Sequence, residues 1–377
     1  MKNTIAIILS CAAVLSARAE RSAAYSIDCF NSACQTNSIS NRVFSPFSYE
    51  LDCCVFAEAS DPVQRANIAE TYGVLTDFES VYRPIVDEFA SVTNPAAPVF
   101  LTARALCLRD VDMAKIGFRK TIWDLCNASV CPLLLMDGAE TWFRAKMDGC
   151  MEDLEFPPAS SVDGRYCYYD VVYASSCLVC ENKPTAVARN FIAADGSRRQ
   201  THFVKARTPV ECYTTSKYAL YRFPLLGGDW LYVATVPEKE EFSSLAKVLN
   251  YDNFRSTLAM MSAVGDPNCK KGVCSLVMPG LKFNTETDLK SAMAANKIPA
   301  SGFANLDSSL VKRDARQIVR FNLKYEETAN AAAALADEDE SATALPDLGE
   351  IVFDRPFLFF VLHPAKDLIT IAGEFVK

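Results

Sequence analysis

The feature that most constrains this chain is a long stretch, residues 326–350, that carries almost no large apolar side chain and separates two strand-like segments. Its first half, Glu326–Ala336, is rich in alanine, and its second half contains the acidic run Asp337–Glu340. A segment of this composition cannot form a core by itself, and long loops inside compact domains are uncommon and usually functional. We therefore expect the segment to lie on the surface. The alternative is a short alanine-rich helix followed by a solvated loop.

The rest of the chain has the composition of a large globular core. Of its 377 residues, 50% are hydrophobic and 11% aromatic, which is too apolar for a disordered chain. The 38 basic and 46 acidic side chains give a net charge of −8 without a long Lys/Arg block. This balance offers no electrostatic reason to bind nucleic acid or an anionic membrane, and we expect neither partner for the mature chain.

Residues 1–19 have the pattern of a secretory signal peptide. Lys2 precedes a short apolar stretch, and Ala17–Ala19 supplies small residues two apart before the expected cleavage point. The apolar run is too short to span a bilayer as a mature helix. A buried N-terminal helix, or lipidation at Cys11, is the alternative. The pattern predicts a secreted, periplasmic or extracellular protein whose mature chain is residues 20–377.

Export would decide the chemistry of the cysteines. The chain has 15, and fourteen remain after Cys11 leaves with the signal peptide, an even number that suits disulfides in an oxidising compartment. The pairs that lie close in sequence are Cys29/Cys34, Cys126/Cys131, Cys177/Cys180 and Cys269/Cys274. Of these, the segment Pro267–Cys274 resembles a turn closed by a disulfide. The alternative, zinc, would rest on thiolates alone, because His202 and His363 are the only histidines; we expect no metal.

Helical and strand patterns alternate irregularly along the chain. Ser45 as N-cap and Pro46 at the first helical position predict a helix that ends near Ala59. Further helices are predicted over Pro62–Tyr72, Ala114–Asn127, Gly138–Cys150, Phe242–Asn250, Asn253–Ala263 and Glu286–Ala295. Strands are predicted over Val99–Leu108, Tyr166–Val179, Cys212–Phe223, Trp230–Val236, Cys274–Met278, Gln317–Tyr325, Ile351–Leu362 and Leu368–Val376. This order favours an α+β fold with large antiparallel or mixed sheets, and no linker divides it.

Four segments, in sequence order, resemble the serpins, the serine protease inhibitor family. Asn41–Ser48 matches the start of the family's second helix, and Glu326–Ala334 is similar to its hinge. Phe353–Phe360 and Ile369–Val376 are similar to its last two strands. The resemblance implies one large domain with several helices packed on three β-sheets, and an exposed reactive loop at about residues 326–350.

The resemblance also implies how the loop works. In the family, a protease cuts the loop and the severed part inserts into the central sheet as a new strand. The hinge that begins this insertion is formed here by Glu326, Glu327, Thr328, Ala329, Asn330, Ala331, Ala332, Ala333 and Ala334. A strand entering a packed sheet needs small side chains on its inward face, since bulk would clash and unpaired charge would be buried. By alternation, Ala329, Ala331 and Ala333 share one face, and all are methyl groups.

The expected function is thus that of an inhibitor and not of an enzyme. The attacking protease supplies the nucleophile, so the resemblance implies no catalytic residue and no cofactor in this chain. In the family the spacing from the first hinge glutamate to the reactive bond is nearly fixed, and counted from Glu326 this implies the bond Ala342–Thr343. A shift of a few residues would make Glu340 or Leu345 the bait. A small residue before the cut suits an elastase-like serine protease, whose primary pocket is shallow. We expect a monomer whose partner is such a protease.

Several residues depart from the family pattern. Thr328 stands where the hinge usually has glycine, and alternation carries Asp337 and Asp339 onto the inward face. Ser45 and Ser48 match serines that the family places under the central sheet, in a region called the shutter. There, Asp170 replaces an expected asparagine, and the usual histidine is absent. These departures favour an alternative, a serpin-like binding protein whose loop does not insert. An enzyme is disfavoured by two histidines and no phosphate-binding glycine loop.

Overall fold

The computed structural model describes residues 30, 40–72, 99–132, 136–154, 165–238, 240–243, 245, 251–261, 266–328, 331, 335, 345–363 and 368–377. The predicted signal peptide and the predicted bond Ala342–Thr343 lie outside these residues, as do Cys29 and Cys34. No helix within the described ranges is long and apolar enough to cross a membrane.

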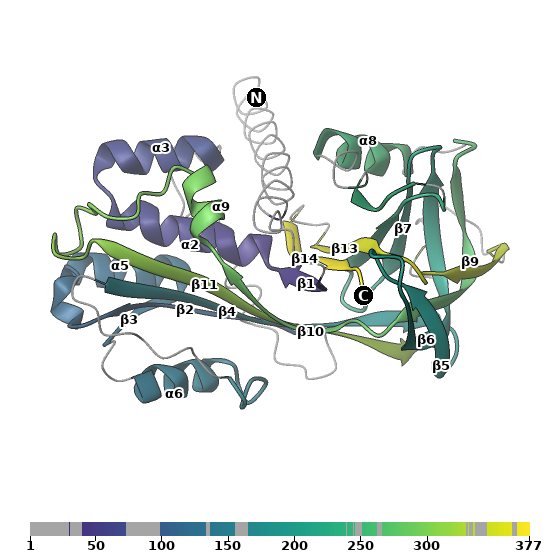
Figure 1. Cartoon of the computed structure of the whole chain (residues 1–377), viewed down its shortest axis with the longest axis horizontal. Helices are drawn as coiled ribbons and strands as arrows, with labels where there is room; N and C mark the ends of the chain where they lie inside the picture. Colours follow the sequence, from purple (N-terminus) through teal and green to yellow (C-terminus); the bar gives the residue numbers. More distant parts are fainter. Residues whose placement is uncertain are drawn as a thin grey trace, which may run out of the picture.

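A five-stranded mixed sheet forms one layer of the molecule (Figure 1). Its strands, in spatial order, are β10 (Lys282–Asp288), β11 (Lys312–Glu327), β4 (Arg165–Cys180), β2 (Val99–Leu108) and β3 (Ala128–Pro132). The two longest strands, β11 and β4, lie side by side and run parallel, from Lys312 opposite Arg165 to Glu327 opposite Cys180. At one edge of the sheet, β2 and β3 are also parallel, and parallel pairing is slightly weaker per residue than antiparallel pairing.

Helices cover both faces of the five-stranded sheet (Figure 1). The helices of the upper face in this view are α2 (Pro46–Ala59), α3 (Pro62–Tyr72), α5 (Ile116–Cys126) and α9 (Lys290–Ala295). The lower face is covered by α6 (Met136–Lys146), whose Phe143 packs in a core cluster with Tyr169 of β4 and Ile318 of β11. Because both faces are covered, β4 and β2 read as nearly continuous apolar runs rather than as alternating strands.

A nine-stranded sheet forms the other half of the molecule. Its strands are β1 (Arg42–Phe44), β14 (Leu368–Phe375), β13 (Phe357–His363), β8 (Trp230–Thr235), β7 (Ala219–Pro224), β6 (Arg198–Thr214), β9 (Cys269–Pro279) and β12 (Asp347–Val352), with β5 (Thr185–Ile192) on β6. The first half of β6 pairs with β5, and its last residues pair with β7. Through this one long strand, two of the three expected sheets are continuous. Helix α8 (Tyr251–Met261) packs beside them, and a 3₁₀ turn spans Val111–Met113.

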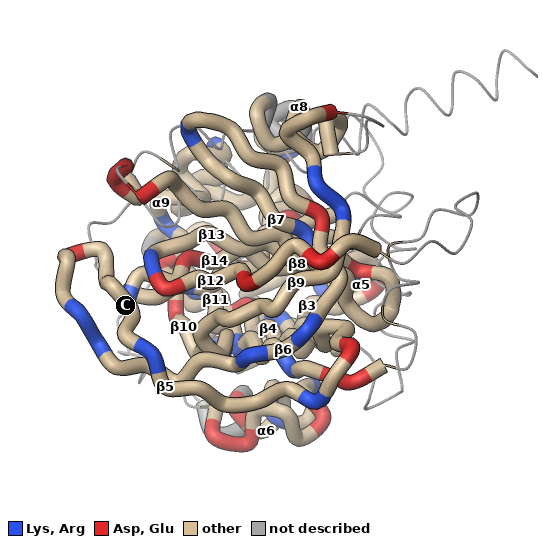
Figure 2. Tube along the Cα trace, turned by 90° about the vertical axis from the view of Figure 1, so that its right-hand side faces the viewer, with Lys and Arg blue, Asp and Glu red and all other residues tan. Residues whose placement is uncertain are grey.

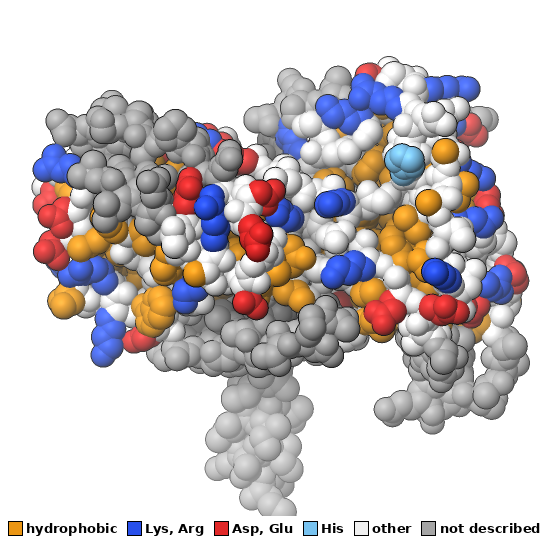
Figure 3. Space-filling model, turned by 90° about the horizontal axis from the view of Figure 1, so that it is seen from below, with side chains coloured by type: hydrophobic (Ala, Val, Ile, Leu, Met, Phe, Trp, Pro, Cys, Tyr) orange, Lys and Arg blue, Asp and Glu red, His pale blue; other side chains and the backbone are white. Residues whose placement is uncertain are grey.

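Aromatic rings join the two sheets. Phe283 of β10 lies 5.2 Å from Phe359 of β13, and Phe321 of β11 lies 5.8 Å from the same ring, measured between centroids. Phe375 of β14 stands edge-on to Phe283 at 6.2 Å. Each such pair stabilises a fold by about 0.5–1.5 kcal/mol beyond burial. The outer surface of the molecule is different: seen from below, it mixes basic, acidic and hydrophobic side chains (Figure 3).

Several elements agree with the sequence prediction. Helix α2 begins at Pro46, and its N-cap Ser45 accepts a hydrogen bond from the backbone N–H of Ser48 at 3.3 Å. Strand β2 and helix α3 have the predicted bounds. The strand predicted over Cys212–Phe223 is wrong, because a turn separates β6 from β7; there Thr215 Oγ1 accepts from the N–H of Tyr218 at 3.0 Å.

The turn predicted over Pro267–Cys274 is also wrong. Strand β9 begins at Cys269, so Cys269 and Cys274 lie in one extended strand, about 16 Å apart at 3.3 Å per residue. A disulfide needs Cα atoms within about 7 Å, which excludes this pair. Cys177 and Cys180 likewise share β4 and, three residues apart, point to opposite faces. No disulfide is formed within the described ranges.

Candidate functional site

A buried polar cluster lies where the first turn of α2 meets the centre of the five-stranded sheet. Gln317 of β11 stands opposite Asp170 of β4, and Asp170 stands opposite Arg104 of β2, so the three form a row across the sheet. The polar cluster consists of Ser45, Ser48, Asp52, Arg104, Asp170 and Gln317. All six are buried, which is rare for such residues unless each polar atom finds a partner.

Gln317 connects the two parallel strands to α2. Its Nε2 donates to Asp170 Oδ2 at 2.8 Å and to the backbone oxygen of Ser45 at 3.0 Å. Its Oε1 accepts from the backbone N–H of Ser45 at 2.8 Å, and Ser45 Oγ donates to the backbone oxygen of Thr370 in β14 at 2.7 Å. The side-chain hydrogen bond from Gln317 to Asp170 crosses from β11 to β4. Any separation of these strands at this level must break it.

Arg104 occupies the other side of Asp170. Its Nη2 donates to Ser48 Oγ at 2.7 Å, and Ser48 Oγ donates to Asp170 Oδ1 at 2.7 Å. Its Nε donates to Asp52 Oδ1 at 3.2 Å, and Nη1 donates to the backbone oxygen of Cys126 at 2.6 Å. The guanidinium therefore lies between two carboxyl groups, with Nη2 3.7 Å from Asp170 Oδ1.

Burial determines the protonation of these groups. Burial would lower the pKa of Arg104, but the neighbouring Asp170 and Asp52 raise it, so the guanidinium stays charged. Burial and the charge of Asp170 raise the pKa of Asp52 well above its usual value, although Arg104 and Tyr168 oppose this. Burial also raises the pKa of Asp170, against the lowering effect of Arg104 and of its hydrogen bonds. At position 170 an ionisable carboxyl group therefore stands where the resemblance implies an asparagine.

The structure brings Ser45, Ser48 and Asp170 together, as the resemblance implied for the shutter. It also brings Gln317 of β11 into hydrogen-bond contact with Asp170. Sequence reasoning missed Gln317, Arg104 and Asp52. The sequence did carry a signal for Arg104 and Asp52. A charged residue within the apolar runs of β2 and α2 must find a partner when the run is buried.

The hinge begins where β11 ends. Glu326 and Glu327 still pair with β4, opposite Val179 and Cys180, and the N–H of Thr328 donates to the backbone oxygen of Cys180 at 2.8 Å. Further along, Ala331 and Leu335 are in 3₁₀ conformation and are only 3% and 4% exposed. At these two residues the expectation that the segment lies on the surface is wrong. The other hinge residues, Ala329, Asn330 and Ala332–Ala334, lie outside the described residues.

Beyond the loop, β12 is held by exposed ion pairs. Glu350 binds Arg189 of β5 at 3.1 Å and Lys205 of β6 at 3.0 Å, and Asp347 binds Arg207 of β6 at 2.8 Å. Figure 2 shows basic residues along β5 and β6, and in the sheet β9 lies between β6 and β12. A glycine allows the close approach of β12 to β9, because a Cβ at Gly272 would collide with Pro346 and Leu348. The two ends of the loop are therefore anchored in different sheets.

The positions of the cysteines decide whether a disulfide could hold the adjacent strands β4 and β11 together. No cysteine follows Cys274 in the chain, so β10, β11 and everything after them contain none. The cysteines of the five-stranded sheet belong to β2, β3 and β4, all on one side of β11. No disulfide can therefore tie β11 to β4 and prevent a strand from entering between them.

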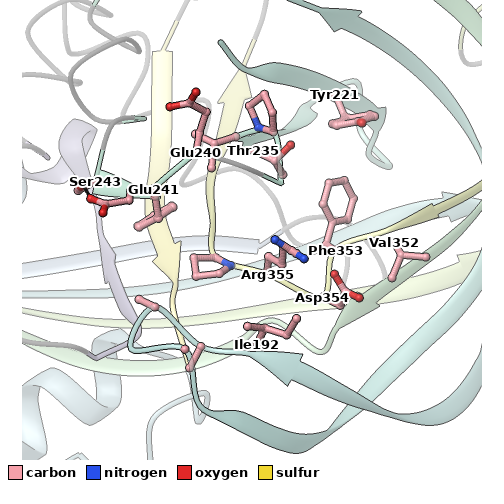
Figure 4. Close-up of a pocket in the computed structure, with 17 residues that line it drawn as sticks. Ile192, Tyr221, Thr235, Glu240, Glu241, Ser243, Val352, Phe353, Asp354 and Arg355 are labelled. Carbon is pink, nitrogen blue, oxygen red and sulfur yellow. Dashed lines mark hydrogen bonds between the residues drawn. The ribbon is translucent and has the colours of Figure 1, made fainter. Parts of the chain in front are cut away.

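A separate pocket of about 610 Å³ lies beside β12. Figure 4 shows Ile192, Tyr221 and Thr235 on its walls, with Phe353 and Arg355 from the segment that follows β12. It includes no residue of the polar cluster. Among the described residues, no group of three or more His, Cys, Asp or Glu side chains is arranged to hold a metal ion.

Residues 20–377 match the family model described as "Serpin (serine protease inhibitor)". This chain therefore belongs to the serpin family. No curated protein sequence matches it.

Solved structures show the same fold. The chain is similar to native protease nexin-1 crystallised with heparin, with a TM-score of 0.77 and 17% identity over 97% of this chain and 99% of that one. It is similar to maspin (TM-score 0.78, 10% identity, 97% and 100% covered) and to serpin-12 of Manduca sexta (0.73, 12%, 95% and 98%). The expected α+β serpin fold is confirmed.

Proposed function

We propose that this chain is an exported serpin that traps a serine protease. The protease serine attacks the carbonyl of Ala342, the bond to Thr343 breaks, and an acyl-enzyme forms while Thr343 leaves as a free amine. The severed loop then inserts between β4 and β11 and carries the acylated protease with it. The chain contributes stored conformational energy and no catalytic group.

One observation carries this proposal: β4 and β11 are adjacent and parallel, and the chain leaves β11 at Glu327 directly into the loop. A strand that turns back from this end would run antiparallel to both neighbours. Insertion would replace one parallel ladder of hydrogen bonds by two antiparallel ladders. The sheet would gain a ladder, and antiparallel pairing is slightly more stable per residue. The alanine face of the hinge and the lack of a cysteine on β11 support the same movement.

The first test is incubation with an elastase-like serine protease followed by electrophoresis in SDS. Trapping predicts a band at the summed mass that resists SDS, because an acyl bond joins the two proteins. A matched pair of variants tests insertion: Ala333→Arg, on the inward face, should abolish the band and leave a clipped product, whereas Ala332→Arg, on the outward face, should retain it. Equal behaviour of the two variants would contradict insertion.

Mass spectrometry of the clipped product would locate the reactive bond. Cleavage after Ala342 supports the register proposed here and an elastase-like target. Cleavage after Glu340 or Leu345 would retain the trapping function but change the class of protease.

The second candidate is a serpin-like binding protein whose loop is cut without inserting. It is favoured by Thr328, whose backbone continues the pairing with β4 instead of ending it, and by Asp337 and Asp339 on the expected inward face. Only clipped product, with no rise in melting temperature after cleavage, would support this candidate. We expect Thr328→Gly to increase the fraction trapped over the fraction clipped, since glycine bends more freely.

Export, disulfide formation and the monomeric state belong to the same proposal. Removal of residues 1–19 predicts a mature chain that begins at Glu20, which N-terminal sequencing would detect. Mass measurement after alkylation, with and without reductant, would count the disulfides. Light scattering would give the oligomeric state.

A further inference from the structure

The charges of the polar cluster do not balance. It holds one guanidinium and two carboxyl groups, and the side chains of Arg104, Asp52 and Asp170 are each 0% exposed. The groups that face this site are, element by element, Asp52 on α2, Arg104 on β2, Asp170 and the phenol of Tyr168 on β4, the Cys126 carbonyl at the end of α5, and the neutral Gln317 on β11. If both carboxyl groups were ionised, an uncompensated negative charge would be buried at high cost.

Hydrogen bonding indicates which carboxyl group holds a proton. Asp170 accepts from Ser48 at Oδ1 and from Gln317 at Oδ2, so both of its oxygens are bonded as a carboxylate prefers. Asp52 accepts at Oδ1 from Arg104 and from Tyr168 at 2.8 Å, while its buried Oδ2 accepts no hydrogen bond. The hydrogen bond between the two carboxyl groups raises the pKa of Asp52 and lowers that of Asp170, which places the proton on Asp52. The raised pKa of Asp52 agrees with a neutral carboxyl there.

The cluster spans the strands that the proposed mechanism separates. Gln317 moves with β11, whereas Asp170, Arg104 and Asp52 stay with β4, β2 and α2. When β11 leaves, Asp170 loses the donor at Oδ2, and water reaches the carboxyl groups that the closed sheet had sealed. The environment that keeps Asp52 neutral therefore exists only while the sheet is closed.

We propose that Arg104 and Asp52 are positioning residues for loop insertion, which hold Asp170 against Gln317, and that the proton on Asp52 sets how readily β4 and β11 separate. This inference rests on the proposed function, because separation of these strands is the step that admits the loop. The separation of β4 and β11 in the uncut protein would then depend on pH, although the polar cluster contains no histidine.

The direction of the pH effect follows from linkage. The pKa of Asp52 is raised in the closed sheet and returns towards its ordinary value when water enters, so separation releases a proton. The stabilisation of the closed sheet is complete below the ordinary pKa of an aspartate and is lost as pH rises through the raised value. Within that window the equilibrium constant for separation rises by up to about tenfold per pH unit, for the one proton released.

Hydrogen exchange of the uncut protein tests this inference. The rates of the β4 and β11 backbone amides are measured in the wild type and in Asp52→Asn at matched pH, so that the intrinsic exchange rate cancels in their ratio. The asparagine keeps an oxygen for Arg104 and cannot ionise. We expect the ratio of wild-type to variant rate to rise several-fold as the pH is raised above the ordinary pKa of an aspartate. A ratio that stays flat would overturn the inference.

Two further variants separate a proton switch from simple destabilisation. Glu374→Gln is the matched control, since Glu374 of β14 is also largely buried, has a raised pKa and pairs with Arg42 at 3.7 Å outside the cluster. It should leave the pH dependence of the β4 and β11 amides unchanged. Tyr168→Phe removes a hydrogen bond that lowers the pKa of Asp52, so it should move the window to higher pH. If Asp52→Asn does not fold, Tyr168→Phe carries the test, and an unmoved window would overturn the inference.

The outcome can be separated from that of the proposed function. A pH-dependent ratio in a protein that traps no protease would support the switch and contradict the inhibitor. If the protein traps a protease but the ratio of wild-type to Asp52→Asn exchange rates does not change with pH, only the proposed role of Asp52 is contradicted.

Discussion

Charged side chains meet in two regions of this molecule, and their surroundings differ. In the polar cluster under the five-stranded sheet, Arg104 and its two carboxyl partners are 0% exposed. At the far end of the loop, the groups that pair with Glu350 are in water, with Lys205 46% and Arg189 38% exposed. Coulomb attraction grows as the dielectric constant falls, but so does the cost of leaving one partner alone. Substitutions in the first region should therefore change the free energy of unfolding strongly. Substitutions in the second should change it little and affect mainly how β12 is held.

The largest effect should come from Arg104→Met. Removing the guanidinium leaves Asp52 and Asp170 without a buried counter-charge, which costs about 3–5 kcal/mol in comparable cases. Urea unfolding of the uncut protein would measure the change. As a control, the triple variant Arg104→Met, Asp52→Asn and Asp170→Asn removes all three ionisable groups and should recover much of the loss. If the triple variant were as unstable as the single one, packing and not charge would explain the effect.

An intermediate effect is expected for Gln317→Leu. The leucine fills a similar volume but leaves the backbone N–H of Ser45 and one oxygen of Asp170 without their partner, at about 1–3 kcal/mol per unsatisfied group. The loss should appear in urea unfolding and as faster hydrogen exchange across β4 and β11. An unchanged exchange rate there would show that the Gln317 bonds do not hold the sheet closed.

The smallest effect should come from Glu350→Gln, which breaks two exposed ion pairs. Such pairs contribute about 0–1 kcal/mol, and salt screens them. We expect a change in unfolding free energy near the error of the measurement at 0.15 M salt, and a larger change at low salt. A loss as large as that of Arg104→Met would show that the two regions do not differ as proposed.

The sequence predicts most of the fold, because local signals and hydrophobic patterns agree in many elements. Ser45 and Pro46 define the start of α2, and the apolar run Val99–Leu108 defines β2. The turn between β6 and β7 was missed because Thr215–Tyr218 contains no glycine or proline, and Thr215 forms the turn through its side chain. The extended edge strand β5 was missed because it lacks a clear apolar alternation.

The candidate site was less predictable. Ser45, Ser48 and Asp170 were found by resemblance, but the partners that make them a cluster are distant in sequence: Arg104 and Gln317 meet Asp170 only through strand register. Register depends on the packing of whole sheets and leaves no local signal in a single sequence. For the same reason, the sequence shows an ionisable residue, Asp52, within an apolar run, but not which groups surround its carboxyl group.

The placement of the cysteines has a consequence for biogenesis. A polypeptide rich in thiols is exposed, while it matures in an oxidising compartment, to many wrong pairings. Here, any cross-link, right or wrong, leaves the chain from Ser275 onward free, and this portion includes β11, the loop and the last strands. If the chain is exported and traps a protease as proposed, oxidative errors would alter the part before Ser275 and spare the part that the proposed insertion moves.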